Sequence, residues 1–159
     1  MLIDSKRFGP LVIPENKLIV MVKPILGFEN LSKFCRIERE EFRPFLWMQS
    51  IEDPAVAFIV VNPALFDSDY RIDINPNEIS ELEPSSPELI ETYVIANIPD
   101  NWKQMTINLQ GPILINTANN KAKQLVLMNS EYKVQQTVFD YEKITATVTK
   151  STVREPVGV

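Results

Sequence analysis

The chain has 159 residues, of which 45% are hydrophobic and 23% are charged, a composition typical of one globular domain with a sizeable core. A net charge of −5 disfavours direct binding to nucleic acid, and the absence of histidine excludes catalytic sites of the Ser-His-Asp and Cys-His types. The single cysteine, Cys35, excludes an internal disulfide and favours a reducing compartment.

The N-terminal residues do not have the pattern of a targeting signal. They lack a basic segment followed by an apolar stretch, which a secretory signal peptide needs. No apolar run in the chain approaches the roughly 20 residues that cross a membrane as a helix. We therefore expect a cytoplasmic protein with no membrane partner.

The N-terminal part of the chain contains short runs of aliphatic and aromatic residues, separated by residues that favour turns. Runs of this kind without a helical period predict β-strands. The run at residues 55–61 is almost wholly apolar, which is typical of a strand buried on both faces, and Asn62-Pro63 ends it. One helical turn is expected at residues 30–33, capped by Asn30. The strands expected in this part cover residues 11–13, 18–22, 34–37, 45–50 and 55–61.

Residues 67–91 differ from the rest of the chain in charge. They contain eight acidic residues against Arg71 alone, a net charge of −7, so the remainder of the chain carries +2 (−5 minus −7). This acidic segment is either a solvated face or a surface that attracts a basic partner and speeds its association. The elements expected in it are a strand at 70–74, a short helix at 77–82, a helix start at Pro87 and a strand at 91–98.

Residues 105–128 predict a β-hairpin preceded by another strand. Pro112 suits the first residue of a strand, where its missing amide hydrogen removes no ladder bond. Asn119-Asn120 suits a hairpin loop with positive φ. We expect strands at 105–109, 112–117 and 123–128, further strands at 132–139 and 143–150, and a frayed end at 151–159.

These elements predict an all-β fold: a small barrel-like or sandwich domain of about ten short strands with a few short helical turns. An α+β fold is the alternative if the acidic segment forms more helix. No repeat or linker interrupts the chain, so we expect a single domain over residues 1–150 and a tail at 151–159.

Few residues in the sequence suggest catalysis. Neighbouring carboxylates can in principle serve acid–base chemistry, but acidic pairs are common on protein surfaces, and we interpret them as solvated loop charges. An enzyme that uses such a pair stays an alternative hypothesis. The pairs are Glu40-Glu41, Glu52-Asp53 and Asp67/Asp69.

Cys35 and the two tryptophans are interpreted as packing residues. Cys35 lies within an apolar run, where a cysteine behaves as a small core residue. Trp47 and Trp102 are expected in the core or at its rim. If they were exposed, they could form the platform of a structural or carbohydrate-binding β-domain, which is a further alternative.

Several short pieces of the sequence form an ordered set that extends from near the N-terminus to Tyr132. They are ILGFENL at 25–31, PFLWMQS at 44–50, Asp53-Pro54 followed by Ala57-Phe58, VNP at 61–63, MTINL at 105–109, GPILIN at 111–116 and NSEY at 129–132. In this order and spacing they resemble the FliW family of flagellar assembly factors.

The resemblance implies a β-barrel-like, cytoplasmic regulator that is not an enzyme and needs no cofactor or metal. Proteins of the family bind flagellin and the RNA-binding regulator CsrA. Binding to CsrA lifts its repression of flagellin translation by an allosteric route, and flagellin displaces CsrA when it accumulates.

If the chain works in this way, the acidic segment is the natural complement of CsrA, because an RNA-binding protein carries basic residues that contact phosphates. Apolar neighbours would hold the complex after the encounter. The residues expected to bind a partner are Glu52, Asp53, Leu65, Phe66, Asp67, Asp69, Tyr70 and Glu78.

Overall fold

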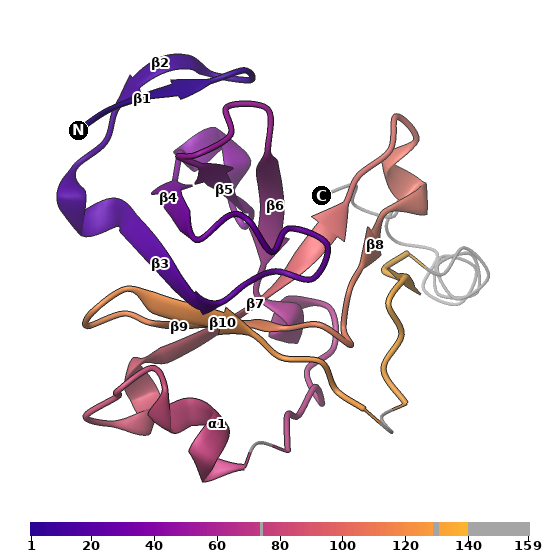
Figure 1. Cartoon of the computed structure of the whole chain (residues 1–159). Coiled ribbons are helices and arrows are strands. Elements are labelled where there is room, and N and C mark those ends of the chain that lie inside the picture. Colours follow the sequence, from indigo (N-terminus) through magenta and orange to yellow (C-terminus); the bar gives the residue numbers. More distant parts are fainter. Residues whose placement is uncertain (74, 129–130, 140–159) are drawn as a thin grey trace.

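The structure is a computed structural model that describes residues 1–73, 75–128 and 131–139 (Figure 1). These residues form eleven short strands, one α-helix and five single turns of 3-10 helix. The strands are β1 (Leu2–Ser5), β2 (Gly9–Val12), β3 (Leu18–Lys23), β4 (Lys33–Ile37), β5 (Leu46–Ser50), β6 (Ala57–Val61), β7 (Ile90–Asn97), β8 (Thr106–Ile107), β9 (Ile113–Asn116), β10 (Lys121–Gln124) and β11 (Gln136–Thr137). The helix is α1 (Pro76–Ser80), and the turns are η1 (Glu15–Lys17), η2 (Glu40–Phe42), η3 (Pro63–Leu65), η4 (Pro87–Leu89) and η5 (Trp102–Gln104).

Seven of the strands close into a barrel. Hydrogen-bonded neighbours follow the order β7-β6-β5-β4-β3-β10-β9, and β9 pairs in turn with β7. The pairs are antiparallel except for β10 and β3, which run parallel. Of the two all-β architectures that the sequence predicts, the barrel is therefore correct, and the α+β alternative is wrong because the one α-helix described has five residues.

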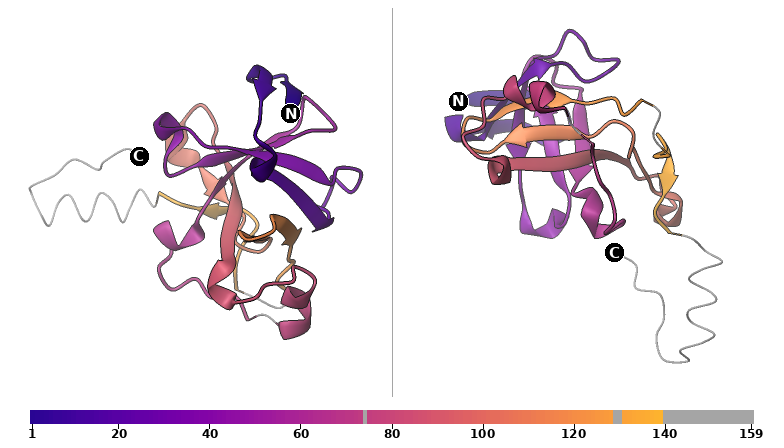
Figure 2. Two further views of the ribbon diagram at one scale, coloured as in Figure 1. Left: turned by 90° about the vertical axis from the view of Figure 1, so that its left-hand side faces the viewer. Right: turned by 90° about the horizontal axis from the view of Figure 1, so that it is seen from below.

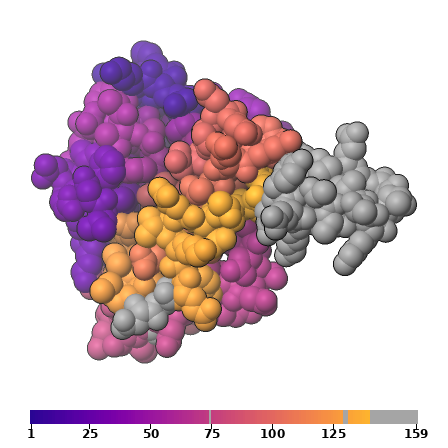
Figure 3. Space-filling model, turned by 90° about the vertical axis from the view of Figure 1, so that its right-hand side faces the viewer, coloured from indigo at the N-terminus to yellow at the C-terminus, as the bar shows by residue number. Residues whose placement is uncertain are grey.

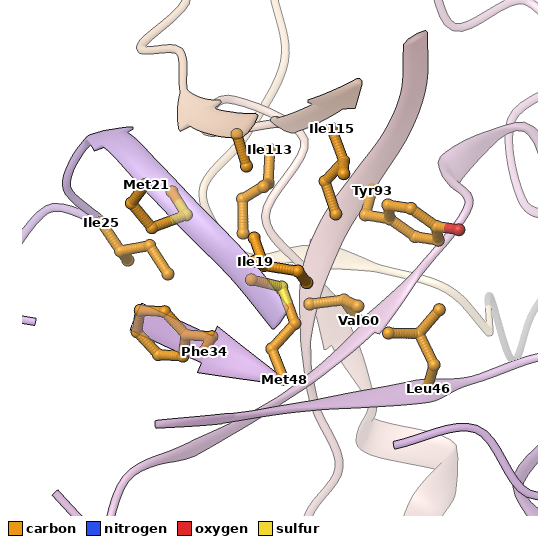
Figure 4. Close-up of a cluster of buried hydrophobic side chains, with 11 residues drawn as sticks. Ile19, Met21, Ile25, Phe34, Leu46, Met48, Val60, Tyr93, Ile113 and Ile115 are labelled. Atoms are coloured by element: carbon orange, nitrogen blue, oxygen red, sulfur yellow. The ribbon is translucent and has the colours of Figure 1, made fainter. Parts of the chain in front are cut away.

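The barrel interior is filled by side chains that alternate with outward-facing ones along each strand. In β4, Phe34 lies in the interior, whereas Cys35 and Ile37 lie in a separate cluster outside the wall. Figure 4 shows how the interior side chains from facing strands meet. The interior cluster consists of Ile19, Met21, Ile25, Phe34, Leu46, Met48, Val60, Tyr93, Ile113, Ile115 and Ala122.

The outer face of the barrel is covered in three places. The β1–β2 hairpin packs Ile3 against Cys35 and Ile37, and on the opposite side of the barrel residues 62–89 pack Leu82 against Leu114 (Figure 2). Near β7 and β8, residues 131–139 complete a third cluster. Wall strands covered on both faces explain why the sequence shows continuous apolar runs rather than a simple alternation.

Most predicted strands are present, with boundaries that differ by up to four residues. The hairpin of the 105–128 region is confirmed as β9 and β10, but β10 begins at Lys121 and ends at Gln124, whereas the sequence predicts residues 123–128. The early start follows from its second neighbour, because Lys121 pairs with Val20 of β3. Beyond Gln124 the backbone makes isolated hydrogen bonds rather than a ladder, such as that from the Leu125 N–H to the carbonyl of Pro112 at 2.8 Å.

Two predicted elements are wrong. Residues 70–73 form no strand, because β6 ends at Val61 and does not run beside them. The Arg71 amide donates to the Tyr132 hydroxyl at 2.9 Å instead. Residues 30–33 form no helical turn, because the amides of Ser32 and Lys33 both donate to one carboxylate oxygen of Glu52.

The predictions near the C-terminus are met only in part. Of residues 132–139, only β11 is a strand, paired with β8. The predicted strand at 143–150 and the tail at 151–159 lie outside the described residues. In the residues that the structure does describe, no helix is long and apolar enough to cross a membrane.

Candidate partner-binding surface

Residues 62–89, which connect β6 to β7, carry six of the eight residues expected to bind a partner. Asn62 begins this connecting segment, and its side-chain oxygen accepts from the Ala64 amide at 2.9 Å, which starts η3. Leu65 is 58% exposed, whereas Phe66 is half-buried against the cluster outside β7. The segment therefore presents Leu65 to solvent and uses Phe66 mainly as an anchor.

Tyr70 is part of the fold rather than of an open surface. Its side chain is buried, its ring lies 4.5 Å from that of Tyr132, and its hydroxyl donates to the carbonyl of Leu109 at 2.7 Å. Burial raises the pKa of the Tyr70 hydroxyl above its usual value. Figure 3 shows residues 131–139, in yellow, between the neighbourhood of β8 and part of the connecting segment. The buried Tyr70 side chain therefore anchors the segment rather than offering an exposed contact.

Three carboxylates in the second half of the acidic segment are paired with lysines of the barrel wall. Lys123 points outward from β10 and is 1% exposed, and its ammonium lies 2.8 Å from the carbonyl oxygen of Glu78. The same ammonium lies 3.4 Å from a carboxylate oxygen of Glu81 and 3.7 Å from one of Glu78. Lys23 also binds Glu81, at 3.1 Å, and this contact is the main reason why the pKa of Glu81 lies below its usual value.

Glu83 is bound in the same way, by Lys121 at 2.9 Å. Three acidic residues of the segment thus fasten it to the barrel rather than offer charge to a partner. The sequence contained a signal for this arrangement: Lys121 and Lys123 share one face of a strand, opposite the buried Ala122. Composition alone could not pair them with a segment about forty residues away.

The first half of the acidic segment keeps its charge. Asp67, Asp69 and Asp73 have no ion pair within the described ranges, and the Asp67 carboxylate accepts only a turn bond from the Asp69 amide, at 3.1 Å. The guanidinium of nearby Arg71 donates hydrogen bonds to the backbone carbonyls of Ser68 and Tyr70. We call the three aspartates the acidic rim.

Glu52 and Asp53 lie away from the acidic rim. They precede β6 whereas residues 62–73 follow it, so the length of the strand, about 16 Å, separates the two groups. Glu52 accepts from the amides of Ser32 and Lys33 at 2.7 and 2.8 Å, and these bonds, with that of Lys33 the larger effect, lower the pKa of its carboxyl. The eight predicted residues therefore do not form one patch: Glu52 and Asp53 lie beyond the far end of β6, and Glu78 lies beside Lys123 of β10.

A groove of about 510 Å³ runs between the connecting segment and β7. One wall is the first half of β7, from Ile90 to Tyr93, and the other consists of residues 62–64 and 70–72. No pattern in the sequence predicted this groove, because it depends on where β6 and β7 stop pairing.

One end of the barrel holds a polar cluster that sequence reasoning missed. Arg36 points inward from β4, and its Nη2 donates to the Tyr93 hydroxyl at 3.0 Å and binds Glu38 at 2.8 Å. The Tyr93 hydroxyl, which Figure 4 shows turned away from the aliphatic side chains, donates to Glu91. Burial is the main cause that raises the pKa of Tyr93, to about 12. The cluster pairs the Arg36 guanidinium with Glu38 and Glu91 at the end of an otherwise apolar interior, while its buried Nε has no partner among the described residues.

The remaining candidate residues have packing roles. Cys35 is fully buried, which confirms it as a core residue, and burial raises its pKa to about 11. Trp47 is half-buried against Phe8, with its ring 4.5 Å from the guanidinium carbon of Arg7. Trp102 is 39% exposed, so the carbohydrate-platform alternative keeps one of its two residues. Among the described residues, no group of three His, Cys, Asp or Glu side chains could hold a metal ion.

Comparisons with known proteins agree with this architecture. The family model described as "FliW protein" matches residues 2–138. The chain belongs to the FliW family. The flagellar assembly factor FliW of Syntrophus aciditrophicus is 38% identical over 135 residues, which cover 85% of each chain. That of Clostridium beijerinckii is 38% identical over 132 residues, which cover 83% of this chain and 94% of the relative.

Two further similarities place the fold beside known FliW proteins. The FliW of Alkaliphilus metalliredigens is 35% identical over 141 residues, which cover 88% of this chain and 87% of the relative. A crystal structure of the flagellar assembly factor FliW superposes with a TM-score of 0.82 at 30% identity, covering 89% of this chain and 99% of that chain. FliW is a family of regulatory or assembly factors, and the barrel described here is the FliW fold.

Proposed function

We propose that this protein is a flagellar assembly factor that works in the cytoplasm by binding two protein partners, CsrA and flagellin. In this proposal, binding to CsrA relieves its repression of flagellin translation by an allosteric route, and flagellin displaces CsrA as it accumulates. No catalytic step is assigned to the protein. The observation that carries the proposal is the similarity over nearly the whole length of the solved FliW chain.

The charge of the acidic rim favours a partner with a basic surface. CsrA binds RNA, so it carries basic residues that contact phosphates. Exposed charge pairs contribute roughly 0–1 kcal/mol each, so their combined effect falls mainly on the association rate. This effect decreases with salt, because the screening length shrinks to about 8 Å at physiological ionic strength. Leu65, exposed beside the rim, is the apolar residue best placed to hold the complex after the encounter.

Association kinetics with purified CsrA test the role of the acidic rim. The variant Asp67→Asn/Asp69→Asn/Asp73→Asn removes three charges, and asparagine at position 67 keeps an oxygen that accepts the turn bond. Glu78 is left unchanged, because its carboxylate lies 3.7 Å from the buried Lys123 ammonium. A matched control, Asp4→Asn/Glu15→Gln/Glu41→Gln, removes the same charge from exposed positions elsewhere.

We expect the rim variant to associate more slowly than the wild type at low salt, by about tenfold, and the difference to shrink at high salt. The control variant should associate at nearly the wild-type rate. Equal rates for both variants would show that the rim is only a solvated face. Retention of neither CsrA nor flagellin by the wild-type protein from its native cytoplasm would contradict the proposed function itself.

A further inference from the structure

The first half of β7 is paired along one edge only. On one side Ile90–Tyr93 pair with β9, but on the other side the ladder with β6 ends where Val61 meets Val94. Asn62-Pro63 then turns the chain away into η3, and Pro63 has no amide hydrogen with which to continue the ladder. A short open edge therefore remains in a barrel that is otherwise closed.

The direction of the backbone groups shows which of them face this edge. The carbonyls of Leu89 and Ile95 accept from the amides of Thr117 and Asn108, on the side of β9 and β8. Backbone groups alternate in direction along a strand, so those of Thr92 point to the opposite side, which β6 has left. Within the described part of the chain, the amide and carbonyl of Thr92 have no backbone partner there. Thr92 is half-buried, and unpaired backbone groups in such a place bind strands readily.

The groove of about 510 Å³ lies directly over this edge. Its opposite wall contains Tyr70, Arg71 and Ile72, where the alternation of the sequence predicts a strand and the structure has no ladder. A strand placed in the groove would supply the missing neighbour for Thr92. It would also lie beside residues 70–72, whose sequence pattern favours a strand and whose first two amides donate to Asp67 and Tyr132.

The charge around the groove selects the kind of strand. Asp69 and Asp73 flank the wall formed by residues 70–72, and Asp67 lies nearby, whereas the guanidinium of Arg71 is turned back onto the carbonyls of Ser68 and Tyr70. Glu91, on the β7 wall, is already bound through Arg36 and Tyr93. Three aspartates against the single guanidinium of Arg71 leave a net negative charge beside the groove, which complements lysine or arginine.

We infer that this groove binds an extended, basic segment of a protein partner, which adds as a strand to the open edge of β7. The inference rests on the proposed function in that it names how a partner of this chain is held, and it does not depend on which partner that is. Backbone hydrogen bonds to Thr92 would supply affinity, and the acidic rim would supply selectivity.

Synthetic peptides of about six residues test the inference on the wild-type protein. The first alternates lysine and valine, the second alternates glutamate and valine, and the third alternates lysine and proline. We expect the lysine–valine peptide to slow hydrogen exchange of the Thr92 amide by about fivefold or more, the effect of one added backbone bond. The glutamate peptide should fail because of its charge, and the proline peptide because it lacks amide hydrogens.

A pair of proline variants tests the same edge from the side of the protein. Thr92→Pro removes an amide hydrogen that points away from β9, so the ladder with β9 is kept. Val12→Pro is the matched control: the Ile13 amide donates to Met1, so the Val12 amide points away from β1, and Val12 is 79% exposed. We expect the lysine–valine peptide to bind the Val12 variant like the wild type and to bind the Thr92 variant at least about tenfold more weakly.

Three outcomes would overturn the inference. The first is an unchanged Thr92 amide with the lysine–valine peptide, or equal protection by the lysine–proline peptide. The second is slow Thr92 exchange without any peptide, because the edge would then be occupied by the chain itself or, if the effect grows with concentration, by a second copy. The third is equal peptide binding by a folded Thr92→Pro variant. Failure here with CsrA and flagellin still retained from the cytoplasm would leave the proposed function standing.

Discussion

The barrel interior and the connecting segment 62–89 are held by different forces. The interior is a closed set of apolar side chains, in which residues such as Phe34, Ile113 and Ile115 are fully buried. The connecting segment is held by a few anchors, namely Leu82, Tyr70 and the lysine contacts of Glu78, Glu81 and Glu83. The difference teaches that the acidic residues divide in two: three of them fasten the segment to the wall, and three aspartates stay free of ion pairs within the described residues.

The largest effect is expected from a cavity in the interior. Ile113→Ala removes a fully buried side chain from β9 and should lower the free energy of unfolding by about 2–5 kcal/mol. Denaturant titration measures this loss. Phe58→Ala, at a half-buried position, should lower the free energy of unfolding less for each carbon atom removed. An Ile113 variant as stable as the wild type would show that the interior is not the main source of stability.

A smaller but still large effect is expected at the main fastening point of the connecting segment. Lys123→Ala removes a buried side chain and leaves the carboxylates of Glu78 and Glu81 without this cation. We expect a loss of about 2–4 kcal/mol in the same titration, below the usual cost of breaking a fully buried pair, because both carboxylates face solvent. Lys121→Ala, whose partner Glu83 is exposed, should lose less than about 1 kcal/mol. Equal losses of stability at Lys121 and Lys123 would show that burial of the lysine does not change how strongly it holds the connecting segment.

A third effect is expected from the hydroxyl that anchors the first half of the segment. Tyr70→Phe keeps the ring in its cluster and removes the bond to the carbonyl of Leu109. The loss should be about 0.5–1.5 kcal/mol, and it should come with faster amide exchange in residues 65–72. A variant whose exchange is unchanged would show that ring packing alone holds this half.

The smallest effect is a change in pH dependence. The pKa of Glu81 in the folded protein is lower than its ordinary value of 4.5, so its contribution to stability is present above that value and is lost as the pH falls through the lowered pKa. Glu81→Gln should therefore make stability less dependent on pH below about 5. Unfolding titrations at several acidic pH values measure the slope, and an unchanged slope would mean that Lys23 and Lys123 do not act through this carboxylate.

The sequence predicts the strands of the barrel well, because side-chain alternation and apolar runs are local signals. The strands predicted at 34–37, 45–50 and 55–61 are found as β4, β5 and β6, because β-branched and aromatic side chains suit a wall covered on both faces. The sequence failed at residues 70–73, where a strand-like pattern has no neighbouring strand to pair with. A local pattern can show that a segment is able to form a strand, but the ladder partner is decided by the whole fold.

From the sequence, the candidate surface could be predicted only as a region of excess negative charge. The excess of acidic residues at 67–91 is visible in the sequence, but its division into fastened and free carboxylates depends on lysines of β3 and β10. Glu52 and Asp53, which the sequence analysis grouped with the rim aspartates, are separated from them by the length of β6. The groove and the open edge of β7 follow from the point where two ladders stop, which no local pattern encodes.

The parallel contact between β3 and β10 has a consequence for how the protein is made. Around this contact the Leu26 amide donates to a residue 98 positions away, and the Asn120 side chain donates to one 104 positions away. Such contacts give the fold a high contact order, so closure of the barrel is a late event in folding. During synthesis, β3 waits until β10 has left the ribosome, and only a nearly complete chain can acquire the groove. A chain that ends before β10 therefore cannot close the barrel.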